Sequence, residues 1–172
     1  MPSPIMNVAD VSLQPTPPAF APTGSAAERF EARTGAIGAL IGARNLGYNV
    51  TAVPPGKRAW PFHNHPAKEE MFFVLQGSGE VRIGEARYPI RTGDIIACPA
   101  GGKDTAHQII NTGTEELRYL AVSTEHSLEM AQYPDSGKFA VKAEFGTAAD
   151  GTPKRFVFVG RDTHPVGFWE GE

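Results

Sequence analysis

The chain has 172 residues, of which 41% are hydrophobic and 20% are charged, and its net charge is −3 at pH 7. This length and composition predict one globular domain with a hydrophobic core. The slightly negative charge gives no support for a nucleic-acid or membrane partner. The single cysteine, Cys98, excludes an intramolecular disulfide. Because the sequence shows neither a signal-peptide pattern nor a continuous apolar stretch of about 18 residues, we expect a cytoplasmic protein.

Residues 1–30 differ in composition from the rest of the chain, since six prolines lie among small polar residues. Proline fixes φ and removes a backbone donor, so we expect an irregular arm that is extended, disordered or laid along a neighbouring surface. Residues 26–33 are compatible with a short helical turn, and residues 36–41 are too short and glycine-rich to classify. The remaining residues, 31–172, are then a single barrel domain with a C-terminal extension.

From residue 48 onward, short β-strand patterns alternate with turn residues, as the high counts of glycine (19) and proline (15) suggest. The expected strands are residues 48–53, 71–75, 80–83, 87–91, 95–98, 105–110, 117–122 and 155–159. Short strands at this even spacing are typical of an antiparallel sandwich or barrel. The sequence therefore predicts an all-β fold.

Three histidines and a glutamate form a candidate metal site. His63 and His65 are two positions apart, so on a strand they point to the same face, whereas Asn64 points away. Glu70 precedes one expected strand and His107 lies in another. Three neutral imidazoles and one carboxylate suit Zn, Mn, Fe, Ni or Co as divalent ions. A six-coordinate ion would keep two open positions, whereas four ligands would complete the shell of a tetrahedral zinc.

The spacing of these residues resembles the first motif of the cupins, G-x5-H-x-H-x(3,4)-E-x6-G. Residues 56–77 match it, with six residues instead of five between the first glycine and His63. Glu69 is an alternative ligand that fits the shorter spacing between histidine and glutamate. Only Glu70 lies six residues before Gly77, so we favour Glu70.

Residues 93–111 resemble the second cupin motif, G-x5-P-x-G-x2-H-x3-N. The departure from the motif is the gap between Gly101 and His107, which has five residues where two are usual. The loop that carries His107 is therefore longer by three residues. Together the two motifs span residues 56–111, about a third of the chain.

The resemblance implies a double-stranded β-helix, or jelly roll, with the metal in its mouth. It also implies dimerisation, often by N-terminal strands that cross between subunits. An uncovered sheet edge at residues 48–53 points the same way, so we expect a two-fold homodimer. Three functions remain open: a sugar or sugar-phosphate isomerase or epimerase, which we favour, an Fe(II)-dependent dioxygenase, and a non-catalytic binder of a small oxygen-rich molecule.

Three further residues are candidates for the substrate pocket, and no catalytic base is identified. Phe72 shares the strand parity of Glu70 and should face inward. Lys103 and His126 are candidates by default. Four basic residues lie near the motifs, where they suit an anionic substrate or are solvated loop charges: Lys57, Arg58, Lys68 and Lys103. We expect Cys98 to be a small buried strand residue, not a reactive thiol.

Overall fold

The computed structural model describes residues 3–171, so Met1, Pro2 and Glu172, at the ends of the expected arm and extension, lie outside the described residues. The strands are β1 (Gln14–Pro15), β2 (Arg33–Ala36), β3 (Leu46–Val53), β4 (Glu70–Gln76), β5 (Ser78–Ile83), β6 (Ala86–Arg91), β7 (Ile95–Cys98), β8 (His107–Ile110), β9 (Leu117–Thr124), β10 (Leu128–Tyr133), β11 (Lys138–Thr147) and β12 (Pro153–Gly160). The helical turns are η1 (Val8–Asp10), η2 (Pro18–Phe20), η3 (Gly24–Ala26) and α1 (Gly38–Ile41).

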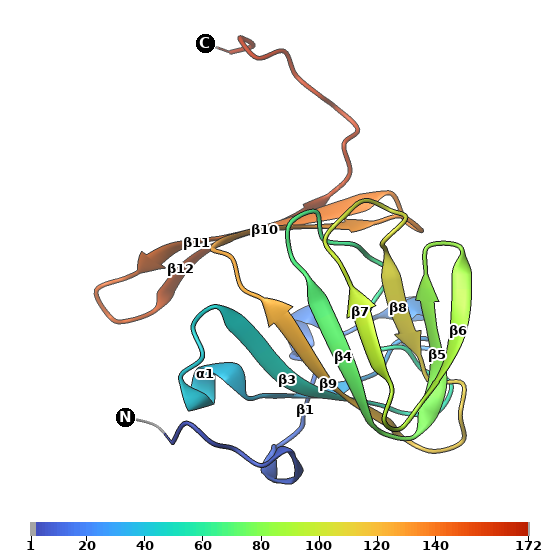
Figure 1. The fold of residues 1–172 in the computed structure, drawn as a ribbon. Helices are drawn as coiled ribbons and strands as arrows, with labels where there is room; N and C mark the ends of the chain where they lie inside the picture. The colour runs from blue at the N-terminus through green and yellow to red at the C-terminus, as the bar shows by residue number, and fades with distance from the viewer. Residues whose placement is uncertain (1–2, 172) are drawn as a thin grey trace.

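The strands form two facing layers (Figure 1). One layer is a six-stranded sheet in the order β1-β2-β3-β9-β4-β7. The other consists of the sheets β6-β5-β8 and β10-β11-β12, which are linked through residues 63–64 by backbone bridges from His63 to His107 and from Asn64 to Gln132. This arrangement is the double-stranded β-helix expected from the sequence, and it confirms the all-β fold class.

The core lies between the layers because side chains alternate along each strand. On β9, Leu117 and Tyr119 point inward and are at most 2% exposed. On β4, Phe72 and Val74 point inward in the same way. Glu70 has the parity of Phe72, so the alternation that builds the core also turns this carboxylate into the space between the layers.

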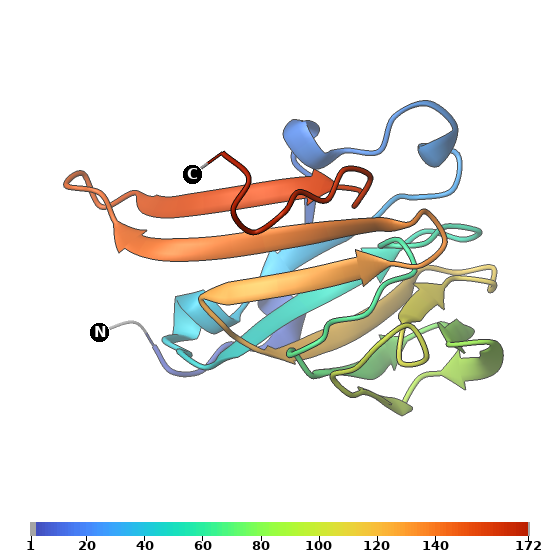
Figure 2. The same ribbon diagram turned by 90° about the horizontal axis from the view of Figure 1, so that it is seen from above.

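The structure departs from the sequence-based expectations at both ends of the barrel. The helical turn considered at residues 26–33 is present only in its first part, where the backbone N–H groups of Arg29 and Phe30 donate to the carbonyl of Ala26. Residue 33 already begins strand β2. Two strands, β10 and β11, lie in the C-terminal extension, where the only expected strand was residues 155–159. The three strands β10, β11 and β12 run side by side across the barrel (Figure 2).

The sheet edge expected to be open at residues 48–53 is covered by the chain itself. Strand β3 pairs with β9 on one side and with β2 on the other, where Gly35 lies opposite Val50. The sequence of β2, Arg-Thr-Gly-Ala, lacks the run of branched residues that signals a strand, which is why this pairing was missed. The outer strands of this sheet are instead β1 and β7.

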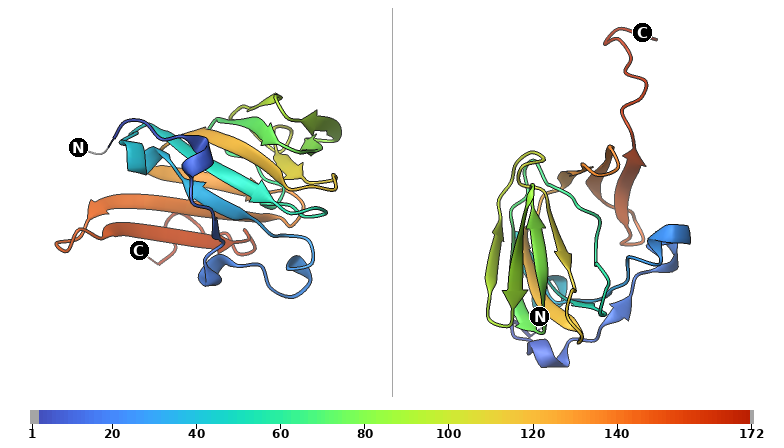
Figure 3. Two further views of the ribbon diagram at one scale, coloured as in Figure 1. Left: turned by 90° about the horizontal axis from the view of Figure 1, so that it is seen from below. Right: turned by 90° about the vertical axis from the view of Figure 1, so that its right-hand side faces the viewer.

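The N-terminal segment is irregular but not detached from the barrel. Gln14 and Pro15 pair with β2, and Nζ of Lys57 donates hydrogen bonds to the carbonyls of Ala27 and Glu28. At the other end, residues after β12 leave the barrel as an extended segment (Figure 3). A domain boundary at residue 30 stays a prediction. Within residues 3–171, no helix is long and apolar enough to cross a membrane.

The turn between β4 and β5 requires glycine at position 77. Gly77 has φ +83°, and a Cβ there would lie 2.7 Å from the carbonyl oxygen of Glu116. We expect Gly77→Ala to lower the free energy of unfolding by about 2–4 kcal/mol, because left-handed strain and a backbone clash add together. Gly93, with φ +95° and open space around it, is the matched control. Denaturant unfolding should show a smaller loss for Gly93→Ala, and equal losses would contradict the clash.

Candidate metal centre

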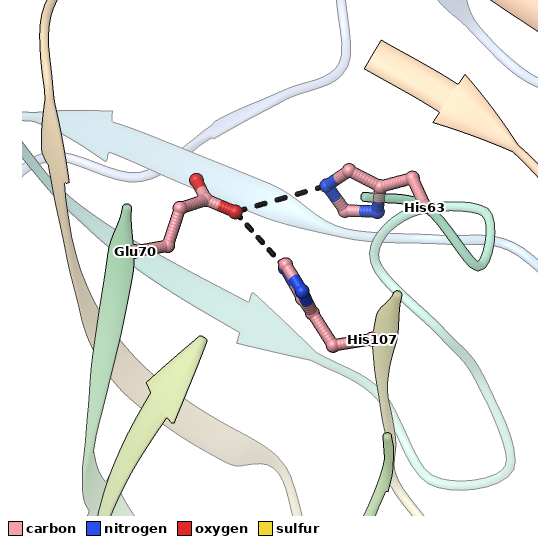
Figure 4. Close-up of side chains that lie close together, drawn as sticks. All are labelled: His63, Glu70 and His107. Carbon is pink, nitrogen blue, oxygen red and sulfur yellow. Dashed lines mark hydrogen bonds and ion pairs between the residues drawn. The ribbon is translucent and has the colours of Figure 1, made fainter. Parts of the chain in front are cut away.

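Three imidazole nitrogens surround one carboxylate oxygen between the two layers. Oε2 of Glu70 lies 3.0 Å from Nε2 of His107, 3.4 Å from Nε2 of His65 and 3.8 Å from Nε2 of His63. His63, Glu70 and His107 each offer a ligating atom, and these atoms lie within 4.8 Å of one another (Figure 4). His65 reaches the same carboxylate oxygen. The structure therefore brings together the four residues that the sequence singled out.

Backbone pairing holds two of these histidines next to each other. His63 and His107 exchange both backbone hydrogen bonds, with N–O distances of 3.2 and 2.7 Å. Between His63 and His65, the side chain of Asn64 points away and donates to the carbonyl of Gly101 and to Oε1 of Gln132. The segment is thus fixed from the side opposite to the site.

The longer loop before His107 does not prevent this residue from reaching the site. The extra residues form a turn, in which the backbone N–H of Thr105 donates to the carbonyl of Gly102 at 3.0 Å. After the motif, the buried Asn111 ties strand ends together through the carbonyls of Val53 and Glu115. Asn111 therefore has a structural role.

The Nδ1 atoms of His63 and His107 face backbone carbonyls outside the centre, and this orients their Nε2 atoms toward the centre. Nδ1 of His63 lies 2.8 Å from the carbonyl of Pro61, and Nδ1 of His107 lies 3.4 Å from the carbonyl of Thr105. A carbonyl only accepts, so a proton on each Nδ1 makes Nε2 the nitrogen that would ligate a metal. This is how histidine ligands are oriented in metalloproteins, and the donor set fits a divalent transition metal. Without metal, Nε2 of His107 instead donates to Oε2 of Glu70 at 3.0 Å.

Glu129 is a site residue that the sequence analysis missed. Its Oε1 lies 3.1 Å from Nδ1 of His65, and its Oε2 lies 2.8 Å from Nζ of Lys68. The contact with His65 has the distance of an ion pair but lacks the alignment of a hydrogen bond. Glu129 lies on β10, where Ala131 and Tyr133 share its face. The alternation in Leu-Glu-Met-Ala-Gln-Tyr was the available signal, and the absence of branched residues obscured it.

These contacts set the charges of the site. Burial, together with His107 and His65, lowers the pKa of His63 to about 4. Burial also opposes charge on His65, but Glu129 and Glu70 outweigh it and raise the pKa of His65 to about 9. The pKa of Glu70 is held well below its usual range by His107 and His65, despite burial. Without metal at neutral pH, His63 is therefore neutral and His65 is protonated.

Two cavities adjoin the centre. One of about 360 Å³ is lined by Glu70, Phe72, Tyr119 and other residues, and one of about 240 Å³ lies on the side of Tyr133. His63, His65, Trp60 and Glu129 line both cavities. Phe72 lies where the sequence predicted it, with its ring centroid 5.6 Å from that of His107.

The other candidates lie elsewhere. Lys103 is exposed in the loop before β8 and lines a neighbouring groove beside Asn64. His126 is exposed between β9 and β10. Neither is among the described residues that line the two cavities of the centre. Cys98 is 1% exposed, and burial with the charge of Glu70 raises its pKa to about 12, which agrees with a buried, unreactive thiol.

Comparisons with known proteins agree with the fold and the motifs. Residues 49–123 match the family described as Cupin domain. Protein SchB of Streptomyces halstedii is 33% identical over 124 residues, which cover 69% of this chain and 84% of SchB. The chain belongs to the cupin family.

Solved structures include relatives with named activities. A protein of Acidithiobacillus ferrooxidans, to which sugar phosphate isomerase activity has been ascribed, is 27% identical with a TM-score of 0.62, and the match covers 73% of this chain and 76% of that one. A sugar phosphate isomerase of the cupin superfamily from Silicibacter pomeroyi is 21% identical with a TM-score of 0.72, over 95% and 97% of the two chains. The second likeness shows the fold alone.

Proposed function

We propose that this cupin holds one divalent transition metal through His63, His65, Glu70 and His107 and binds a small oxygen-bearing molecule at it. The observation that carries the proposal is the convergence of three Nε2 atoms on one oxygen of Glu70. The adjoining cavities supply the space for a ligand. The donor set of three imidazoles and one carboxylate suits Zn, Mn, Fe, Ni or Co as the divalent ion.

The candidate reaction is isomerisation, in which a proton moves between neighbouring carbons of a hydroxy-carbonyl compound. A bound metal would act as a Lewis acid toward the carbonyl oxygen. Phe72 and Tyr119 are buried and contribute aromatic wall to the larger cavity. Glu129 lines both cavities as a carboxylate, so it is positioned to take the proton. His65 and Lys68, despite burial, hold its pKa at about 2, which makes it a weak base.

A ligand screen tests the proposal. Small chelating hydroxy acids should raise the melting temperature of the metal-loaded protein, since a ligand at 100 times its Kd adds about 2.7 kcal/mol of stability. The His107→Ala variant should show no such effect. The absence of any binder in the millimolar range would contradict an open site. If a ligand binds but its carbon-bound proton does not exchange in heavy water, the protein is a binding protein and not an isomerase. Consumption of oxygen would favour a dioxygenase.

We also propose that the chain forms a two-fold homodimer. Because the sheet edge at residues 48–53 is covered by β2, the support now comes from a different strand. Strand β12 is the outer strand of its sheet, and Phe156, Val157, Phe158 and Val159 are each 44–57% exposed. Exposed apolar edge strands favour pairing with another chain. Light scattering should give twice the chain mass of 18.4 kDa, and a monomer at micromolar concentration would contradict it.

A further inference from the structure

The cations beside the metal centre are already paired with carboxylates. Nζ of Lys68 lies 2.8 Å from Oε2 of Glu129 and 3.7 Å from Oε1 of Glu125, and its side chain is 10% exposed. Nζ of Lys142, at the rim of the smaller cavity, lies 3.3 Å from Oε1 of Glu144. Phosphate recognition normally requires charge-assisted hydrogen bonds. The buried Lys68 is committed to Glu129. The only other described lysine that lines these cavities, Lys142, lies at the rim beside Glu144.

The remaining walls are aromatic, aliphatic or neutral. Trp60 is 43% exposed and borders both cavities. The ring of Tyr133 stacks beside that of His63, with centroids 6.2 Å apart and an angle of 29° between the planes. Thr34 and Asn49 add neutral polar groups to the larger cavity. Such walls gain from burying a flat apolar group.

Unlike these walls, a neighbouring groove contains cations. Arg29, Arg58 and Lys138 line a groove of about 480 Å³, together with Glu31 and Asp135. This groove shares Trp60 and Tyr133 with the smaller cavity, but no candidate metal ligand lines it. Nζ of Lys138 lies 5.7 Å from the centroid of the Tyr133 ring, but Lys138 lines this groove and neither cavity of the centre.

We infer that the ligand of this site carries an aromatic or similarly flat apolar body next to its chelating oxygens, and no phosphate. This inference rests on the proposed function and specifies its substrate class. The chelating oxygens would bind at the metal, and the ring would lie against the indole of Trp60. A phosphate that lies in either cavity away from the metal would meet the carboxylate of Glu129, and among residues 3–171 no unpaired lysine or arginine lines these cavities to offset its charge.

Two matched ligand pairs test this inference on the full chain loaded with Co(II). Mandelate and glycolate share the same hydroxy-acid head, and mandelate adds a phenyl ring. Gluconate and 6-phosphogluconate also share a hydroxy-acid group, and they differ only by the phosphate at the other end of the carbon chain. We expect mandelate to bind at least about tenfold more tightly than glycolate, from burial of the ring. We expect 6-phosphogluconate to bind no more tightly than gluconate. Calorimetry and the visible spectrum of Co(II) measure both pairs.

Variants at Trp60 distinguish the loss of ring stacking from a disruption of the site's structure. Trp60→Ala should remove the preference for mandelate by weakening mandelate binding much more than glycolate binding, while Trp60→Phe should keep most of the preference. The backbone carbonyl of Trp60 accepts a hydrogen bond from Gln108, which these substitutions retain. Tighter binding of 6-phosphogluconate, or equal binding of mandelate and glycolate, would overturn the inference alone. Protein that takes up no metal would overturn the proposed function and this inference with it.

Discussion

Replacing Glu70 or His107 with alanine is expected to lower the affinity for divalent metal by at least about a hundredfold. Glu70 lies at the meeting point of the three imidazoles, and His107 makes the shortest contact with it, at 3.0 Å. Loss of an outer residue that merely orients a ligand costs about 10–100-fold in affinity, so loss of a ligand should cost more. Competition with a chromophoric chelator measures this change, and circular dichroism should show that the barrel remains folded.

Glu69→Ala is the matched control for Glu70→Ala. The side chain of Glu69 is exposed, and its backbone bonds to Thr124 do not depend on the carboxylate. Its replacement should leave metal affinity unchanged. If Glu69→Ala removed the metal and Glu70→Ala did not, the ligand assignment would be wrong.

Metal affinity is expected to rise by about a hundredfold between pH 6 and pH 8. With its pKa raised to about 9, His65 holds a proton throughout this range in the metal-free protein. The metal must displace that proton, so each pH unit below 9 costs about a factor of ten. His63, with a pKa of about 4, is already neutral and adds nothing to the slope in this range.

Calorimetry in buffers of different ionisation enthalpy should detect about one proton released per metal bound at pH 7. Glu129→Gln removes a carboxylate that raises the pKa of His65, so this variant should release fewer protons at pH 7 and show a shallower slope. A flat affinity profile between pH 6 and pH 8 would contradict the charge state assigned to His65.

The sequence predicts the barrel strands and the ligand set because both follow local patterns. Strands β4, β5, β6, β7 and β9 lie within a few residues of their expected ranges, since turns of glycine or asparagine separate them. Histidines two positions apart on extended backbone share a face, which is enough to pair His63 with His65. The choice of Glu70 over Glu69 follows from its spacing to Gly77 in the cupin motif. The alternation along β4 gives Glu70 the same parity as the buried Phe72.

The rest depends on pairings that are distant in sequence. Glu129 contacts His65 from 64 positions away, across the bridge between Asn64 and Gln132. No local pattern indicates that β10 covers the site, and its residues lack the β-branched side chains that are typical of strands. The charge of Lys68 suggested an anionic ligand in the sequence, but only the fold shows that Glu129 neutralises it.

The metal content of protein purified without added metal tests the central claim most directly. Elemental analysis should find close to one divalent transition-metal ion per chain in the wild-type protein and almost none in His107→Ala. Wild-type protein that contains no such ion, and takes up none of Zn, Mn, Fe, Ni or Co on titration, would contradict a metal centre at His63, His65, Glu70 and His107.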